Sequence, residues 1–203
     1  MNAEDQARLR SLDRQFEAVR RLVDPIPPRE RYRARIESLR AGGFLRVRGK
    51  TFCVQIVHEY REKRSKWFEL ELFCIDDGAT VMLEWEKDDE VELSLSGPRI
   101  DLRALRVTPD EVEAMSEAEE GRIRFEGRTY HYDDDYKATF HRDGAGDGER
   151  VYFYDFETSD ERYCLSVEEW GSAEDGYEYE AYVSEYLEED ALEILRLGAA
   201  DDV

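Results

Sequence analysis

Residues 43–52 read GFLRVRGKTF, and residues 121–130, 78 positions later, read GRIRFEGRTY. In each stretch apolar and polar side chains alternate up to a glycine, Gly49 or Gly127, and the alternation resumes after it. Strand-like alternation on both sides of a tight glycine turn is typical of a β-hairpin. We therefore expect two similar hairpins.

The sequence beyond the first hairpin predicts an antiparallel meander. Residues 67–75 (WFELELFCI) alternate, Asp76-Asp77-Gly78 favours a tight turn, and residues 80–86 (TVMLEWE) return as the next strand. Residues 165–169 (LSVEE) align with residues 81–85 (VMLEW) at an offset of 84, and the loop at 143–148 accounts for the six extra residues. We interpret the two halves as an internal duplication, with coincidence as the alternative. Each half then has about five strands, closed as a barrel or packed as a sandwich.

Four helices are expected around these β units. The spacing of apolar residues predicts a helix near residues 9–23, which Asp24-Pro25-Ile26-Pro27-Pro28 must end, and a second short helix over about 29–40 completes a helical hairpin. Thr108-Pro109-Asp110-Glu111 predicts a capped helix running to about Glu120. Residues 187–197 are expected to form a short closing helix.

The fold class is therefore predicted as α+β and mainly β, with two similar antiparallel β units. The expected boundaries are a basic helical arm over residues 1–42, a first β unit over 43–107, a linking helix over 108–120, and a second β unit with the C-terminal helix over 121–203.

The charge distribution separates the arm from the rest of the chain. The whole chain has 29 basic and 50 acidic side chains, a formal net charge of −21. Residues 1–42 hold ten Arg against seven Asp or Glu, a net of +3, which leaves −24 for residues 43–203. Such acidity argues against a nucleic-acid partner. It reflects either a salty cytoplasm or a dedicated acidic binding surface.

The sequence also indicates a cytoplasmic protein. No apolar run is long enough to span a bilayer, and the first residues lack the apolar core of a secretory signal. Three widely spaced cysteines argue against a disulfide framework or a zinc ribbon.

The arm is the first candidate interaction site. Its apolar residues follow helical spacing on one stripe, and arginines occupy its other faces. Such a helix suits the chain's own acidic body, a second copy, a protein partner such as a membrane-stress protein, or peripheral contact with an anionic membrane. The predicted arm residues are Leu9, Leu12, Phe16, Val19, Val23, Arg14, Arg20 and Arg21.

Two further candidates lie in the β units. On a regular strand His131, Asp133 and Asp135 share one face, where they could bind a divalent metal, although a solvated strand face is the simpler interpretation. Trp67, Trp85 and Trp170 mark an aromatic face, expected to pack in the sheet, or to bind a cation such as a polyamine if it is exposed beside acids.

The sequence contains no nucleophile motif and only three histidines. Carboxylate pairs such as Glu84 with Glu86, or Glu168 with Glu169, are expected by chance in so acidic a chain. We therefore favour a non-enzymatic protein, and assign no catalytic residue and no cofactor.

The repeated unit resembles a family of bacterial and archaeal β-rich domains of unknown function. The resemblance rests on residues 49–52, 67–70 and 83–86 of the first half and on 127–130 and 167–170 of the second. The resemblance implies a β-rich fold. Members of this family are often encoded beside phage-shock-protein-A-like membrane-stress genes and polyamine-synthesis genes, and no catalytic residues are assigned to them.

The sequence leaves three hypotheses for the function. The leading hypothesis is a non-enzymatic adaptor or accessory protein, in a membrane-stress response. The first alternative is a β-barrel that binds a small ligand or cation (a polyamine or a divalent metal). The second alternative is a hydrolase that uses paired carboxylates, which needs a deep pocket with two acids of displaced pKa.

Overall fold

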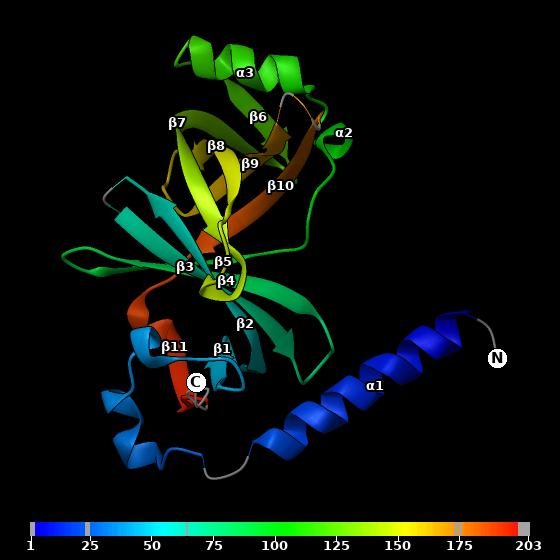
Figure 1. Cartoon of the computed structure of the whole chain (residues 1–203), viewed down its shortest axis with the longest axis vertical. Helices are drawn as coiled ribbons and strands as arrows, with labels where there is room; N and C mark the ends of the chain where they lie inside the picture. Colours follow the sequence, from blue (N-terminus) through cyan, green and yellow to red (C-terminus); the bar gives the residue numbers. More distant parts are fainter. Residues whose placement is uncertain (1–2, 23–24, 64, 173, 175, 199–203) are drawn as a thin grey trace. The chain divides into compact units, whose positions relative to one another are not determined.

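The computed structural model describes residues 3–22, 25–63, 65–172, 174 and 176–198. The chain divides into two compact units. Unit 1 holds residues 1–57, 70–83 and 188–203, and unit 2 holds residues 58–69 and 84–187. Unit 2 consists mainly of β-strands, whereas unit 1 combines strands with the N-terminal helix (Figure 1). Among the described residues no helix combines the length and the apolar composition that crossing a membrane requires.

The element order confirms a mainly β chain with an N-terminal helix. The strands are β1 (Phe44–Val47), β2 (Lys50–Glu62), β3 (Ser65–Cys74), β4 (Thr80–Lys87), β5 (Val91–Ser96), β6 (Arg122–Phe125), β7 (Arg128–His141), β8 (Glu149–Thr158), β9 (Tyr163–Ser172), β10 (Gly176–Tyr186) and β11 (Leu192–Arg196). The helices are α1 (Ala3–Arg21), α2 (Leu102–Leu105) and α3 (Pro109–Glu117). Short 3-10 turns are η1 (Pro28–Arg33), η2 (Ile36–Ser38), η3 (Arg142–Gly144) and η4 (Glu189–Ala191).

The described strands form one antiparallel sheet in the order β11-β1-β2-β3-β4-β5-β10-β9-β8-β7-β6. An additional pairing joins β2 to β7 within unit 2 through three residue pairs, among them Tyr60 with Phe140. Because this closing contact is so short, the sheet is not a clean barrel. Strands β2, β3 and β4 each have residues in both units.

The two predicted hairpins are present. Both turns have two successive residues in the left-handed region, with φ of 51° and 78° at Arg48 and Gly49, and 47° and 78° at Glu126 and Gly127. This conformation matches the twist of the paired strands in a two-residue hairpin. Phe44 pairs with Cys53 across the first hairpin, and Arg122 pairs with His131 across the second. The two registers therefore coincide at the offset of 78 seen in the sequence.

The linking helix is confirmed as α3, which lies beside β7 (Figure 1). The Thr108 hydroxyl accepts a hydrogen bond from the Glu111 amide, and the Glu111 carboxylate accepts one from the Thr108 amide at 2.8 Å. This reciprocal capping box satisfies two free amides of the first turn. Val112 is fully buried in the core of unit 2.

Two expected helices are corrected. Residues 29–40 contain the 3-10 turns η1 and η2 instead of a second α-helix. The chain on either side of these turns is bonded to β11 and its end: the Ile26 amide donates to the Leu195 carbonyl at 2.7 Å, and the Arg40 amide donates to the Leu197 carbonyl at 2.8 Å. Residues 192–196 form β11 instead of a closing helix, since they pair with the free edge of β1. In both cases tertiary hydrogen bonds outweigh local helix propensity.

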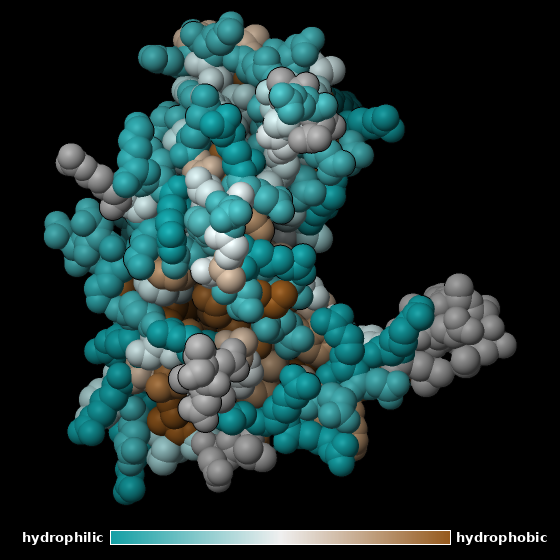
Figure 2. Space-filling view, viewed as in Figure 1, coloured by the Kyte–Doolittle hydropathy of each residue, from teal (hydrophilic) through white to brown (hydrophobic). Residues whose placement is uncertain are grey.

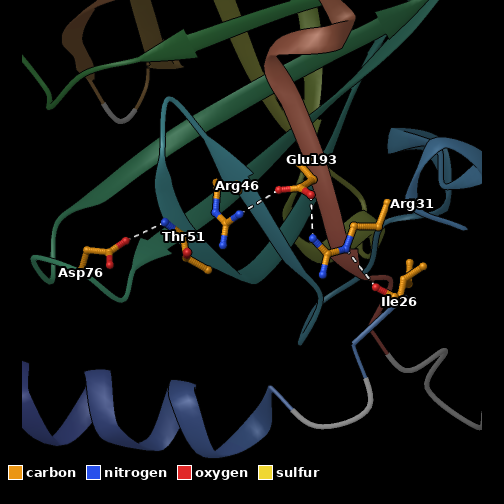
Figure 3. Close-up of polar contacts among 6 residues, drawn as sticks. All are labelled: Ile26, Arg31, Arg46, Thr51, Asp76 and Glu193. Atoms are coloured by element: carbon orange, nitrogen blue, oxygen red, sulfur yellow. Dashed lines mark hydrogen bonds and ion pairs between the residues drawn. The ribbon is translucent and has the colours of Figure 1, made fainter. Parts of the chain in front are cut away.

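Polar contacts hold residues 26–31 in place within unit 1 (Figure 3). The Glu193 carboxylate on β11 accepts hydrogen bonds from Arg31 at 2.6 Å and from Arg46 at 2.9 Å. Arg31 also donates to the Ile26 carbonyl at 2.9 Å. The hydrogen bond from Arg31 is the main reason that the pKa of Glu193 lies below its ordinary value.

Candidate functional site

Helix α1 packs on unit 1 with a face that differs from the predicted apolar stripe. The Gln15 amide donates to the Ile75 carbonyl at 3.3 Å, and the Arg14 guanidinium lies over the Phe73 ring, 4.4 Å from its centroid. Ala18 is buried in a cluster with residues of β1, β2, β3 and β11. Small and polar side chains therefore form the docked face of α1.

Gly78, in the turn after β3, allows this close approach. Its φ is +76°, and a side chain there would collide with the Ser11 hydroxyl of α1. The turn predicted at Asp76-Asp77-Gly78 is therefore also part of the surface on which α1 packs.

The apolar stripe faces away from the protein. The exposed fractions of Leu12, Phe16 and Val19 are 51%, 63% and 51%. The Leu9 side chain and Val23 lie outside the described residues. An exposed phenylalanine flanked by two aliphatic side chains is the pattern of a docking surface. We call Leu12, Phe16 and Val19 the α1 stripe.

The predicted arginines of the arm have separate roles. Arg14 packs on Phe73, as described above. Arg20 pairs with Glu17 one turn before it at 3.2 Å, with both side chains exposed. The backbone carbonyl of Arg21 accepts a hydrogen bond from Arg196 of β11. All three arginines are exposed, and Arg20 lies beside the α1 stripe with its guanidinium 5.4 Å from the centroid of the Phe16 ring.

The predicted metal ligands do not share one strand face. A register shift between Tyr132 and Asp134 interrupts β7, so the alternation assumed for His131, Asp133 and Asp135 fails. His131 and Asp133 are exposed, and Asp135 is partly buried. Within the described ranges no three His, Cys, Asp or Glu side chains are grouped so that they could hold a metal ion.

Asp135 instead accepts hydrogen bonds from three hydroxyl groups. Its donors are Tyr132, Tyr152 and, at 3.0 Å, Ser116 of α3. Burial alone would raise the pKa of this carboxyl, but the three hydrogen bonds outweigh burial and lower the pKa. Burial, and then the hydrogen bond that Tyr152 donates to Asp135, raise the pKa of Tyr152 to about 12. The contacts of Asp135 therefore tie β7, β8 and α3 together.

The three tryptophans are largely packing residues. Trp67 stacks on Tyr60 with ring centroids 5.2 Å apart, and Trp85 stacks on Phe68 at 4.5 Å. Both tryptophans are buried, whereas Trp170 is half-buried and meets Phe140 edge-on. They do not form one exposed aromatic face.

Unit 2 contains an acidic cavity of about 190 Å³. The cavity lies among strands β4, β5, β7, β8, β9 and β10, and none of the residues that line it is Lys, Arg or His. Its carboxylates are Glu84, Glu86, Glu92, Asp155 and Glu168, and its other lining residues are Leu93, Ser94, Tyr136, Phe153, Cys164, Ser166 and Tyr186.

Burial sets the protonation of this acidic cavity. Burial, and then the charge of Glu69, raises the pKa of Glu84 to about 8. Burial likewise raises the pKa of Asp155 to about 6, although the Ser166 hydroxyl donates to its carboxylate at 2.6 Å. The pKa of Glu168 is also raised by burial, against a 2.9 Å hydrogen bond from the Trp170 indole. At neutral pH the cavity therefore holds protons that a bound cation could replace.

A groove of about 590 Å³ in unit 1 has a different character. It is lined by both arginines and acids, among them Arg31, Arg35, Glu189 and Glu193. Since Glu193 already pairs with Arg31 and Arg46, its charge is satisfied within the protein. On the face drawn in Figure 2 hydrophilic residues dominate the surface, as the composition predicts.

In the sequence, Glu84 and Glu168 belong to carboxylate pairs that are expected by chance, and no pattern marks Asp155. Glu84 lies between Leu83 and Trp85, which are both buried on the other face of β4. Alternation alone assigns Glu84 to a solvated face. Its burial depends on strands β7 to β10, which are distant in the sequence.

A family model described as a domain of unknown function (DUF4178) matches residues 40–189. This stretch includes β1 to β10 and excludes α1. No curated protein and no solved structure matches the chain.

Proposed function

Because the chain belongs to the DUF4178 family, which is defined without a known function, we propose a role from its geometry: a non-enzymatic accessory protein that assembles through the α1 stripe. The observation that carries this proposal is that α1 is seated on unit 1 by one face while Leu12, Phe16 and Val19 remain exposed on another. The family domain is then a shared body, and the helix outside the matched residues is the element that makes contacts.

Three finer points belong to this proposal. The matching registers of the hairpins β1–β2 and β6–β7 support an internal duplication of the body. The setting in a membrane-stress response is supported by the resemblance of the repeated unit to β-rich domains encoded near such genes. A location in the cytoplasm is supported by the three widely spaced cysteines, which are free thiols.

The proposal is tested with a tagged full-length chain isolated gently from its own cells. We expect a polypeptide to co-purify in stoichiometric amount and to be lost with Phe16→Glu, because a charge in the α1 stripe opposes apolar contact. The matched control is Tyr177→Glu, at a tyrosine of unit 2 that is 51% exposed. Equal recovery with both variants would refute the arm as the contact element.

A second candidate function is the binding of a small organic cation in the acidic cavity. The observation that favours it is five carboxylates lining one cavity that has no basic side chain in its wall. The cavity also holds two acids with displaced pKa values, Glu84 and Asp155, as a hydrolase with paired carboxylates would need. However, its volume of about 190 Å³ lies below the roughly 300 Å³ at which ligand pockets usually begin, so a chain-like substrate does not fit. A primary diamine is small enough.

Thermal denaturation with putrescine tests this candidate. A cation that binds only the folded chain raises the melting temperature. The rise should be larger at pH 8 than at pH 6, since the Glu84 carboxyl must lose its proton. NaCl of equal ionic strength controls for screening of the net charge of −21. A rise that is identical in Glu84→Gln would exclude the cavity as the site.

A further inference from the structure

We infer that the occupant of the α1 stripe is the α1 stripe of a second copy of this chain, packed antiparallel about a two-fold axis near Phe16. The inference rests on the proposed role of α1 as the contact element and names its partner. Its support is the pattern of charges beside the exposed apolar residues.

The charges lie on one flank of the α1 stripe. At 100° per residue, Leu12, Phe16 and Val19 fall within about 60° of one another, and Asp13 and Arg20, two turns apart, follow on the same side. Both Asp13 and Arg20 are exposed. The helix therefore presents an apolar seam with an acid toward its start and a base toward its end.

This arrangement is complementary to itself in one orientation. In an antiparallel pair the same flanks of the two helices face each other, and the start of one helix lies beside the end of the other. Asp13 of each copy then faces Arg20 of the other copy. A parallel pair would instead place this flank against the opposite flank of the other helix, so that Asp13 and Arg20 of the two copies would not face each other. Arg20 can exchange partners, because its pair with Glu17 and its contact over the Phe16 ring, 5.4 Å from the centroid, are both solvent-exposed and therefore weak.

Charge also disfavours an anionic membrane as the occupant. Residues 43–203 carry a net charge of −24 and would be repelled by such a surface. The exposed residues nearest the α1 stripe include Asp13 and Glu17 as well as Arg20, so the helix does not present a uniformly basic face. Because three apolar side chains per copy form a small interface, the expected dimer is weak, with a dissociation constant in the micromolar range.

Sedimentation velocity of the full-length chain over about 1 to 200 μM tests the inference at this weak affinity. We expect a concentration-dependent dimer whose dissociation constant rises at least tenfold in Phe16→Glu and stays unchanged in Tyr177→Glu. Far-UV circular dichroism of each variant checks that α1 remains folded.

A charge-reversal experiment tests the antiparallel register. Asp13→Arg and Arg20→Asp should each weaken self-association, since each creates like-charge pairs. An equimolar mixture of the two variants should restore a heterodimer, because both of its cross-helix pairs are again opposite in sign. A mixture no tighter than either variant alone would overturn the antiparallel arrangement.

The outcomes separate this inference from the proposed function. If the wild-type chain stays monomeric at every concentration, the inference that a second copy packs on the α1 stripe is refuted. If that monomer nevertheless loses a cellular partner through Phe16→Glu, the accessory function stands. Co-sedimentation of the monomer with phosphatidylserine vesicles, abolished by Phe16→Glu, would assign the stripe to a membrane instead.

Discussion

Replacing Glu84 with glutamine should stabilise unit 2 at neutral and alkaline pH and leave its stability unchanged near pH 4.5. In the folded chain this carboxyl holds its proton up to about pH 8, because it is buried in the acidic cavity beside Glu69. In the unfolded chain it loses the proton near its ordinary pKa of 4.5. Between these two values the folded state binds a proton that the unfolded state lacks, so stability falls as pH rises.

The size of the effect follows from the displacement of the pKa. As the pH rises from 4.5, the ordinary pKa, to about 8, the free energy of unfolding of the wild-type chain falls by about 1.36 kcal/mol per pH unit through this group. The total loss is about 5 kcal/mol. By pH 7 about 3 kcal/mol of that is lost. Glutamine is uncharged and nearly isosteric, and it can still accept the hydrogen bond that Trp67 donates to Glu84. The variant should therefore exceed the wild type by these amounts.

Urea denaturation followed by tryptophan fluorescence, at pH values from 4.5 to 8.5, measures this difference. All three tryptophans lie in unit 2, as does Glu84. A smaller slope between about pH 4 and 6 should survive in the variant, because Asp155 has a pKa raised to about 6. Glu178→Gln, at an exposed position of β10, is the matched control. A Glu84→Gln variant that gains no stability between pH 5 and 8 would refute the reasoning.

Three further predictions concern stability and the polar contacts. Leu72→Ala, at a fully buried position of β3, should cost about 3 kcal/mol by leaving a cavity, and urea denaturation followed by circular dichroism tests this; a loss below about 1 kcal/mol would contradict the packing. Thr108→Ala should cost about 1 kcal/mol by removing the α3 cap, seen as faster amide exchange in the first turn of the helix; unchanged exchange would refute the role of the cap. Asp135→Asn should lower the pKa of Tyr152 from about 12, because a neutral acceptor holds the phenolic proton less tightly; an NMR titration of the ring that is unchanged would rule this contact out.

Local patterns in the sequence were sufficient for much of the fold. The glycine turns predicted the hairpins β1–β2 and β6–β7, and Thr108 with Glu111 predicted the start of α3. These features depend on neighbouring residues, through turn conformation and capping, and therefore follow from the sequence itself. The prediction of helix for residues 192–196 was wrong because the edge of β1, some 150 residues earlier, is available for pairing.

The candidate sites divide in the same way. Helical spacing identified Leu12, Phe16 and Val19 as one stripe. Gly78 and the cluster around Phe73 determine which face of α1 packs against unit 1. The acidic cavity needs strands from both halves of the family domain. By itself the sequence determined the short-range conformations, the charge and the apolar stripe. Only the tertiary structure decided which side chains lose contact with water, because burial is a property of packing between residues that are far apart along the chain.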